Sequence, residues 1–264
     1  MLKNRIHIFA ISYNEEPFVK NFLAGYKDAE RIVVYDNFST DDTVELLQKD
    51  PRVEVRFYDS NNQIRDDLYL EIKNHAWKEA RGKAEWVIVV DFDEIFNRCF
   101  LDGATAKFDL DLREQTKQGY NIIKPCGYNM ISLDAPLYAE GHPFLYSQKA
   151  TYHVPEEKLC CFNPNELSEI NYYAGCHRSE PLDRQQGVRD LRVCFDPRFK
   201  LMHFKFWNLE AYIPRMVEYQ TRLSDWNRRM GAGWHYVNTA EWHRDCYVNG
   251  YNHAKYLFDV PKPE

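Results

Sequence analysis

The segment from Glu85 to Phe96, EWVIVVDFDEIF, restricts the possible folds more than any other part of the chain. Five consecutive apolar residues, 86–90, predict a strand that is buried on both faces. Three carboxylates, Asp91, Asp93 and Glu94, follow at once. Because open α/β sheets bind ligands at the carboxyl ends of their strands, we expect a binding site where this strand ends.

Asp91 and Asp93 are two positions apart, so on an extended backbone their side chains would point the same way. Two such carboxylates repel each other unless a cation lies between them, and hard divalent cations prefer oxygen ligands. The pair therefore indicates a Mg²⁺ or Mn²⁺ site that handles phosphate. The alternative is an acidic, solvated strand end without a ligand.

The preceding residues alternate between short apolar runs and segments with helical periodicity. The order β-α-β-α-β-α-β in about 95 residues predicts a parallel sheet with right-handed crossovers. Strands are expected at residues 6–11, 31–35, 53–58 and 86–90, and the third helix at 66–81. Polar residues at the strand ends would line one crevice: Asn14, Glu15, Asp36, Asn37, Ser39, Asp91 and Asp93.

The pattern changes after residue 100. Residues 121–125 and 149–153 are expected to be short strands, and an apolar stripe at residues 208–229 predicts a helix. Pro214 lies within that stripe, so the helix either starts near residue 211 or kinks there. His75 has apolar neighbours at helical spacing, and we expect it to be packed rather than catalytic.

The composition narrows the class of protein. A net charge of −6 does not suit a nucleic-acid-binding protein. The seven cysteines include no CxxC pair, and no apolar run approaches the roughly 20 residues of a membrane span. With no signal peptide evident, a cytoplasmic protein with reduced thiols is expected. The aromatic last quarter has a small excess of basic residues and could contact the inner face of a membrane peripherally.

Three motifs in order resemble nucleotide-sugar glycosyltransferases of the GT-A fold, in the family 2 group: SYNEE (12–16), YDNFSTDDT (35–43) and EWVIVVDFDE (85–94). The resemblance covers residues 6 to about 98. It implies an α/β fold with a mostly parallel sheet flanked by helices. The catalytic domain would span 1–205, with a nucleotide-binding half (1–100) and an acceptor half (101–205). An aromatic-rich helical extension would follow at 206–264.

The resemblance also implies roles for particular residues. Asp91 and Asp93 match the family's DxD motif, which holds Mn²⁺ or Mg²⁺ against the diphosphate of a donor, most simply a UDP-sugar. His203, in KLMHFKFWNLEAY, matches a late histidine that contributes to metal or diphosphate binding. Tyr13 and Glu15 would border the nucleoside, and Asp36 would hydrogen-bond its base or ribose. Asn37 and Ser39 would support that loop, and His177 would lie near the donor or acceptor sugar.

The general base is not fixed by any motif. Similar enzymes use an Asp or Glu of the second half, commonly in an E-D pair, but no such pair follows residue 97. Glu180 and Asp183 are the candidates, Asp190 is another, and each could instead be a solvated loop carboxylate.

We therefore expect an inverting, metal-dependent glycosyltransferase, with inversion implied by the resemblance alone. It would move a sugar to a hydroxyl of a glycan or glycolipid in surface polysaccharide or lipopolysaccharide synthesis.

Three other classes of protein share part of this sequence pattern. A haloacid-dehalogenase-type phosphatase also has an apolar strand ending in DFD, but that strand would come first, and Ile95 occupies a Thr or Val position. A sugar-phosphate nucleotidyltransferase would have a Gly-rich basic loop in place of SYNEE. A carbohydrate-binding, degenerate transferase module fits the missing E-D pair but not the intact Asp91 and Asp93.

Overall fold

A computed structural model describes residues 5–98, 108–133, 149–184 and 191–257. The first half forms the expected alternation of strands and helices. Four neighbouring strands are mutually parallel, in the order β4-β1-β2-β3. They are β1 (Ile6–Ser12), β2 (Arg31–Asp36), β3 (Val53–Phe57) and β4 (Trp86–Asp91). The α/β class with a mostly parallel sheet flanked by helices is thus confirmed.

Later segments extend the larger sheet beyond β4 to seven strands, in the order β12-β6-β9-β4-β1-β2-β3. The added strand β9 is antiparallel to both β4 and β6, whereas β12 is parallel to β6. The added strands are β6 (Ile122–Ile123), β9 (Cys161–Phe162) and β12 (Val193–Cys194).

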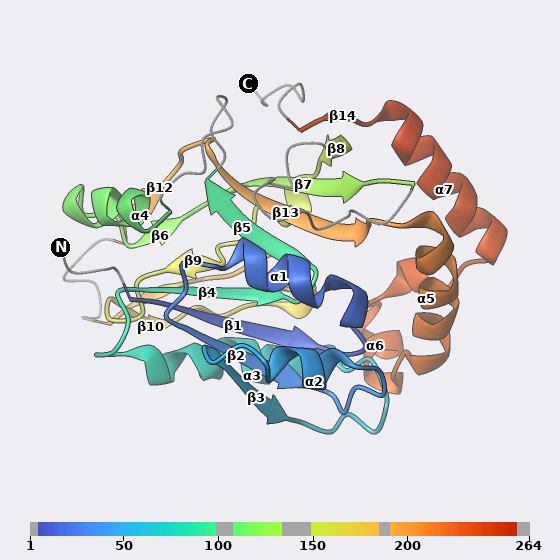
Figure 1. Cartoon of the computed structure of the whole chain (residues 1–264), viewed down its shortest axis with the longest axis horizontal. Coiled ribbons are helices and arrows are strands. Elements are labelled where there is room, and N and C mark those ends of the chain that lie inside the picture. The colour runs from blue at the N-terminus through green and yellow to red at the C-terminus, as the bar shows by residue number, and fades with distance from the viewer. Residues whose placement is uncertain (1–4, 99–107, 134–148, 185–190, 258–264) are drawn as a thin grey trace.

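A second sheet has five strands in the order β14-β8-β7-β13-β5. Figure 1 shows this sheet above the larger one, with α1 between them. Its longest strand, β13, is antiparallel to β5 and parallel to β7. The strands are β5 (Glu94–Arg98), β7 (Cys126–Ile131), β8 (Lys149–Tyr152), β13 (Phe199–Phe206) and β14 (Lys255–Tyr256). Strands were expected near β6 and β8 from the sequence.

Helices cover both faces of the larger sheet and the end where β1 and β2 finish (Figure 1). The first four are α1 (Val19–Gly25), α2 (Thr43–Leu47), α3 (Asp66–His75) and α4 (Phe108–Lys117). The last three are α5 (Leu209–Arg222), α6 (Asp225–Met230) and α7 (Ala240–His253). Short 3₁₀ helices are η1 (Glu16–Phe18), η2 (Ala76–Ala80), η4 (Val154–Glu156), η5 (Ala174–Cys176) and η6 (Trp234–Tyr236). A hairpin of β10 (Leu167–Glu169) and β11 (Leu182–Asp183) lies apart from both sheets.

The two faces of β4 belong to different cores, as its unbroken apolar run predicted. Ile88 and Val90 belong to the core that includes α1 and the second sheet. Val87 and Val89 belong to the core built around Trp77 of η2. The alternation of side chains along the strand explains the division, and the burial of both faces fixes the position of the strand's acidic end.

Two expectations about helices differ from the structure. The apolar stripe of residues 208–229 is interrupted at Leu223, where α5 ends and Ser224 caps α6. The first of these helices begins at Leu209, with the Asn208 side chain as its N-cap, and continues through Pro214. It therefore starts before residue 211, because the capping side chain supplies an acceptor for the first turn.

His75 was expected to be packed, but it is exposed, and its Nδ1 lies 2.8 Å from the carbonyl oxygen of Glu71. The buried side of this helical segment carries Lys73, Trp77 and Ala80 instead. The helix is thus rotated by about one residue relative to the expected stripe, which places a lysine in the interior.

The cysteines and the helices bear on the expectations drawn from composition. Cys160 and Cys161 are both buried in the core and form no disulfide. In the described part of the chain, no helix combines the length and the apolar character that crossing a membrane requires.

Candidate functional site

Three neighbouring strands of the larger sheet end at one edge. The central strand β1 pairs with β2 on one side and β4 on the other, so Ser12 lies opposite Asp36 and Ile11 opposite Asp91. The expectation that the ends of the first, second and fourth strands share an edge is confirmed. The polar residues that follow these strands form the candidate site.

Asp36, the last residue of β2, joins the loops that follow β1 and β2. It is fully buried, and its carboxylate accepts hydrogen bonds from the Ser12 hydroxyl (2.7 Å), the Ser39 N–H (2.7 Å) and the Ser39 hydroxyl (2.6 Å). The Ser39 oxygen in turn accepts from the backbone N–H of Asn14 (2.8 Å). The carboxylate thus orders two loops at once.

Asn37 connects the same edge to the loop after β3. Its side-chain amide donates to the Ser60 hydroxyl (2.8 Å), and its carbonyl oxygen accepts from the Ser60 N–H (3.1 Å). The next residue, Phe38, has a positive φ of 56° and a ring that stacks on Phe57 at 5.1 Å. Both rings are more than half exposed. The loop therefore presents aromatic surface beside a rigid polar base.

The acidic end of β4 is a tight turn rather than extended chain. Asp91 ends β4, Phe92 and Asp93 form the turn, and Glu94 starts β5. The expectation that Asp91 and Asp93 project in the same direction from an extended backbone is therefore wrong. The Glu94 carboxylate accepts a hydrogen bond from the Asp91 N–H at 2.9 Å and so closes the turn.

Asp91 is ion-paired with two lysines. Lys73 of α3 contacts Oδ1 at 2.6 Å, and Lys158 lies 3.6 Å from Oδ2. Burial opposes ionisation of Asp91, but the two ammonium groups outweigh it and hold the pKa of this carboxyl below its usual value. Asp91 is therefore a charged carboxylate with cations on both oxygens.

Lys158 also contacts two glutamates. Its ammonium group is paired with Glu94 and lies 3.3 Å from Glu156, which is part of η4. Burial raises the pKa of Glu94 to about 7, although Lys158 opposes that shift. Burial favours neutral Lys158, but the surrounding carboxylates outweigh it and raise the lysine pKa well above its usual value. Lys158 is thus the central cation of this cluster.

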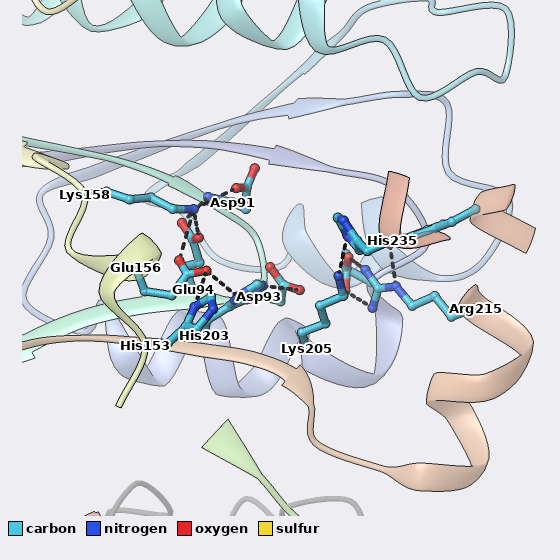
Figure 2. A network of polar contacts seen from close by, with 12 residues as sticks. Asp91, Asp93, Glu94, His153, Glu156, Lys158, His203, Lys205, Arg215 and His235 are labelled. Atoms are coloured by element: carbon cyan, nitrogen blue, oxygen red, sulfur yellow. Dashed lines mark hydrogen bonds and ion pairs between the residues drawn. The ribbon is translucent and has the colours of Figure 1, made fainter. Parts of the chain in front are cut away.

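Asp93 faces His203 of β13 on the other side of the turn (Figure 2). The Nε2 of His203 lies 3.3 Å from Asp93, and its Nδ1 lies 3.1 Å from Glu156. Burial disfavours the imidazolium form, but Asp93 and Glu156 prevail and raise the pKa of His203 to about 10. His203, for which the resemblance implies a role in metal or diphosphate binding, thus lies beside the acidic end of β4.

Cations from the C-terminal part surround the same carboxylate. After burial, which opposes ionisation, the groups that lower the pKa of Asp93 are His203, Arg215 and Lys205. Lys205 is two residues beyond His203 and lies 3.1 Å from His235. Burial lowers the pKa of Lys205 to about 8. These positive groups make this side of the site suitable for an anion.

The loop after β1 is attached to α5 by two contacts. Glu15 forms a bidentate ion pair with Arg215, in which one N–O distance is 3.1 Å. The guanidinium group of Arg222 stacks on the ring of Tyr13, 3.6 Å from its centroid. Tyr13 and Glu15, both predicted to border a nucleoside, thus lie between the parallel sheet and the C-terminal helices.

The remaining predicted residues lie in the segment after η4. His177 is exposed, and its Nδ1–H donates to the carbonyl of Pro155, one residue before Glu156. Glu180 is exposed, and its carboxylate hydrogen-bonds Tyr173. Asp183 belongs to β11, in the hairpin with β10. Asp190 lies outside the described residues.

Several charged residues of the site were not identified from the sequence: Lys73, Glu156, Lys158, Lys205 and Arg215. Lys73 could have been found, because it lies four residues before Trp77 on the buried side of one helical segment. Lys205 could have been found because it lies two residues after His203, and side chains two apart on a strand lie on the same face. Lys158, in VPEEKLCC, carries no local pattern that distinguishes it from a surface lysine.

The side chains around Asp93 fit a divalent cation in chemical type. A carboxylate oxygen and an imidazole nitrogen are suitable ligands for Mn²⁺. Asp93 and His203 pair with each other at 3.3 Å, so an ion held between them would replace the proton on His203. The second ring nitrogen faces Glu156, an arrangement typical of metal-binding histidines.

Comparisons with known proteins agree with the fold. Residues 8–113 match the family described as Glycosyl transferase family 2. A 90-residue segment is 32% identical to the SPbeta prophage-derived glycosyltransferase SunS of Bacillus subtilis (strain 168), covering 33% of this chain and 20% of that protein. The glycosyltransferase SunS of Bacillus phage SPbeta matches to the same extent. The chain thus spans about a fifth of the length of these curated relatives.

The mostly parallel sheet flanked by helices is consistent with the GT-A fold, and the matches concern the part of the chain that forms its first half. Residues 8–113 are similar to family 2 glycosyltransferases, and the rest of the chain lies outside that match. The resemblance to family 2 glycosyltransferases that the three motifs indicated is confirmed for this segment.

Solved structures show only distant similarity. A 4-diphosphocytidyl-2C-methyl-D-erythritol synthase is 16% identical, with 82% of this chain and 98% of that chain covered and a TM-score of 0.38. HddC from Yersinia pseudotuberculosis is 12% identical, with coverages of 81% and 97% and a TM-score of 0.36. At these scores the similarities add nothing to the functional argument.

Proposed function

We propose that the chain is an inverting, metal-dependent glycosyltransferase that uses a nucleoside-diphosphate sugar, most simply a UDP-sugar. The acceptor would be a hydroxyl of a glycan or glycolipid, in surface polysaccharide or lipopolysaccharide synthesis. The observation that carries the proposal is the Asp93–His203 pair beside Lys205 and Arg215, at the edge of the sheet ordered by Asp36.

The donor diphosphate would lie against the positive side of this edge. Lys205 and Arg215 offer ammonium and guanidinium donors to phosphate oxygens. Asp93 and His203 would hold Mn²⁺ or Mg²⁺, with Asp91 at the opposite side of the turn. When bound there, the divalent ion neutralises the charge that develops on the leaving nucleoside diphosphate.

The nucleoside would lie over the loops after β1 and β2. Asp36 is fully buried, so it would support the nucleoside by holding these two loops in place, together with Asn37 and Ser39. Tyr13 and Glu15 would border this pocket. Because α5 fixes both of these residues through Arg222 and Arg215, the C-terminal helices would contribute to donor affinity.

The acceptor hydroxyl needs a general base on the face of the sugar opposite the leaving group. Glu180 and Asp183 remain the proposed candidates, with His177 proposed to contact a sugar. In Glu180→Gln and Asp183→Asn, loss of the base should lower kcat at least 100-fold while leaving the donor Kd unchanged. If both variants keep wild-type kcat, these assignments are wrong.

Donor binding tests the proposal directly. Thermal unfolding with UDP-, GDP- and CMP-sugars, with and without Mn²⁺, should show metal-dependent stabilisation by one nucleotide class. Asp93→Ala should remove the stabilisation, whereas Glu210→Ala, at an exposed position of α5, should keep it. Absence of stabilisation by every donor would reject the proposal and favour the carbohydrate-binding, degenerate transferase module.

Aromatic side chains of the C-terminal region support a peripheral contact with the inner membrane face, where a lipid-linked acceptor would be reached. Trp234 is 70% exposed, Trp242 is 41% exposed, and Arg228 and Arg229 are exposed nearby in sequence. Tryptophan favours the membrane interface, and arginine favours anionic lipid. Co-sedimentation with anionic vesicles should decrease in Trp234→Ala/Trp242→Ala; unchanged or absent binding would remove this part of the proposal.

A further inference from the structure

The cluster at the end of β4 already contains a cation supplied by the protein. The ammonium group of Lys158 lies among the carboxylates of Asp91, Glu94 and Glu156, which come from the β4–β5 turn and from η4. Figure 2 shows these side chains converging on the lysine. Lys158 is 4% exposed, so its charge is balanced by these groups rather than by water.

The three carboxylates converge on the position that the Lys158 ammonium group occupies. Two of them also belong to a group that could hold a metal ion, since ligand atoms of Glu94, Glu156 and His203 lie within 4.8 Å of one another. Glu94 is completely buried, and Glu156 is 2% exposed. One oxygen of Glu156, Oε2, is buried without a hydrogen-bond partner, although it lies 3.3 Å from the Lys158 ammonium group. A buried carboxylate oxygen of this kind is a ready ligand for a cation.

A second lysine makes the arrangement rigid. Lys73 contacts the other oxygen of Asp91 at 2.6 Å and is 5% exposed. It lies on the buried side of α3, four residues before Trp77. A divalent ion on Asp91 or Glu94 would lie in direct contact with these ammonium groups. The repulsion excludes it while both lysines are present.

We propose that Asp91, Glu94 and Glu156 form a latent divalent-cation site whose cation position is occupied by the Lys158 ammonium group. While the ammonium group is there, these carboxylates bind the lysine instead of a metal ion. Lys158 is thus a positioning residue: it restricts the protein's cation binding to the opposite side of the turn, where Asp93 faces His203. The part of the inference that concerns an ion at Asp93 rests on the proposed function. The latent site at Lys158 does not depend on it, because that site exists whether or not an ion binds at Asp93.

Counting bound Mn²⁺ tests the inference. The free Mn²⁺ signal in electron paramagnetic resonance gives the number of ions bound per chain. Lys158→Met, which removes the ammonium group and keeps most of the apolar stem, should bind one more Mn²⁺ than the wild type. Lys158→Arg retains a cation and should bind the wild-type number. An equal number for Lys158→Met and the wild type would overturn the inference.

Two further measurements separate the possible failures. If Lys158→Met does not fold in the absence of metal, Mn²⁺ should restore its thermal transition, and failure of restoration overturns the inference. The charge-balanced Lys158→Met/Glu94→Gln removes a ligand together with the lysine and should lose the additional ion. A wild type that binds no Mn²⁺ would reject the proposed ion at Asp93, while a change from zero to one ion in Lys158→Met would still support the latent site.

Discussion

Arg215 of α5 forms a bidentate ion pair with Glu15, 200 residues earlier in the chain. Glu15 is 6% exposed, and burial raises its pKa to about 7 despite the guanidinium group. The pair attaches the C-terminal helices to the loop after β1. It also holds the Arg215 charge near Asp93.

Arg215→Met should therefore destabilise the protein strongly, because it leaves a buried carboxyl group without its partner. We expect the free energy of unfolding in urea to fall by about 3–5 kcal/mol. Arg244→Met is the matched control, since Arg244 lies 3.6 Å from Glu210 in an exposed pair and should contribute at most about 1 kcal/mol. Equal losses in the two variants would show that the buried pair has no special role.

Asp36→Ala should loosen the two loops that the carboxylate joins. The Ser39 N–H and the Ser12 hydroxyl lose their acceptor, which should cost about 1–3 kcal/mol of unfolding free energy. Hydrogen exchange at the Ser39 amide should become faster. In Ser12→Ala the acceptor of the Ser39 amide is retained, so exchange at that amide should stay slow; fast exchange in both variants would contradict the role of Asp36.

The parallel half of the fold could be predicted because its signals are local. The run at residues 86–90 needs only its own composition to indicate a strand buried on both faces. The second sheet could not be predicted in the same way, because β13 pairs with β5 and β7, which are far away in the sequence. No local pattern selects such partners.

The site residues that could be predicted are those at the end of a strand or directly after it. Asp36 and Asp93 were found for this reason. The turn at Phe92 and Asp93 was missed because DFDE contains no glycine or proline, and its aspartates, although common in turns, equally suit a ligand site at a strand end. Lys158 was missed because its burial depends on carboxylates contributed by β4 and β5, about 65 residues earlier.

Gly127 of β7 should be intolerant of any side chain. A Cβ atom there would lie 2.5 Å from the backbone carbon of Glu156 and 2.6 Å from the carbonyl oxygen of His153. Backbone atoms cannot move aside cheaply, so Gly127→Ala should displace η4 and cost about 1–3 kcal/mol in unfolding free energy. Gly250→Ala is the control, because the nearest atom there is a flexible one, Ile131 Cδ1, at 3.3 Å.

The same displacement should reach the candidate site, since Glu156 contacts both Lys158 and His203. We expect Gly127→Ala to weaken donor-dependent stabilisation in addition to lowering the melting temperature. If Gly127→Ala and Gly250→Ala melt alike and bind donor alike, the close approach of η4 to β7 is not a constraint on the site.

His7 should make the protein sensitive to mild acid. Burial lowers the pKa of this histidine to about 4, and Arg31 adds to the effect. The unfolded chain takes up a proton below about pH 6.5, whereas the folded chain does so only near pH 4. Stability is therefore complete above pH 6.5 and is lost as the pH falls from 6.5 to 4. The charged groups around His7 are Arg5, Glu30, Arg31, Glu79 and Lys83.

His7→Gln removes this titration and retains a polar side chain. The decrease in unfolding free energy between pH 7 and pH 4.5 should be about 2–3 kcal/mol smaller in the variant than in the wild type. Urea denaturation at both pH values measures that difference, and NMR titration of the wild type reports the pKa of His7 itself. An ordinary pKa for His7, or an equal decrease in the two proteins, would refute the prediction.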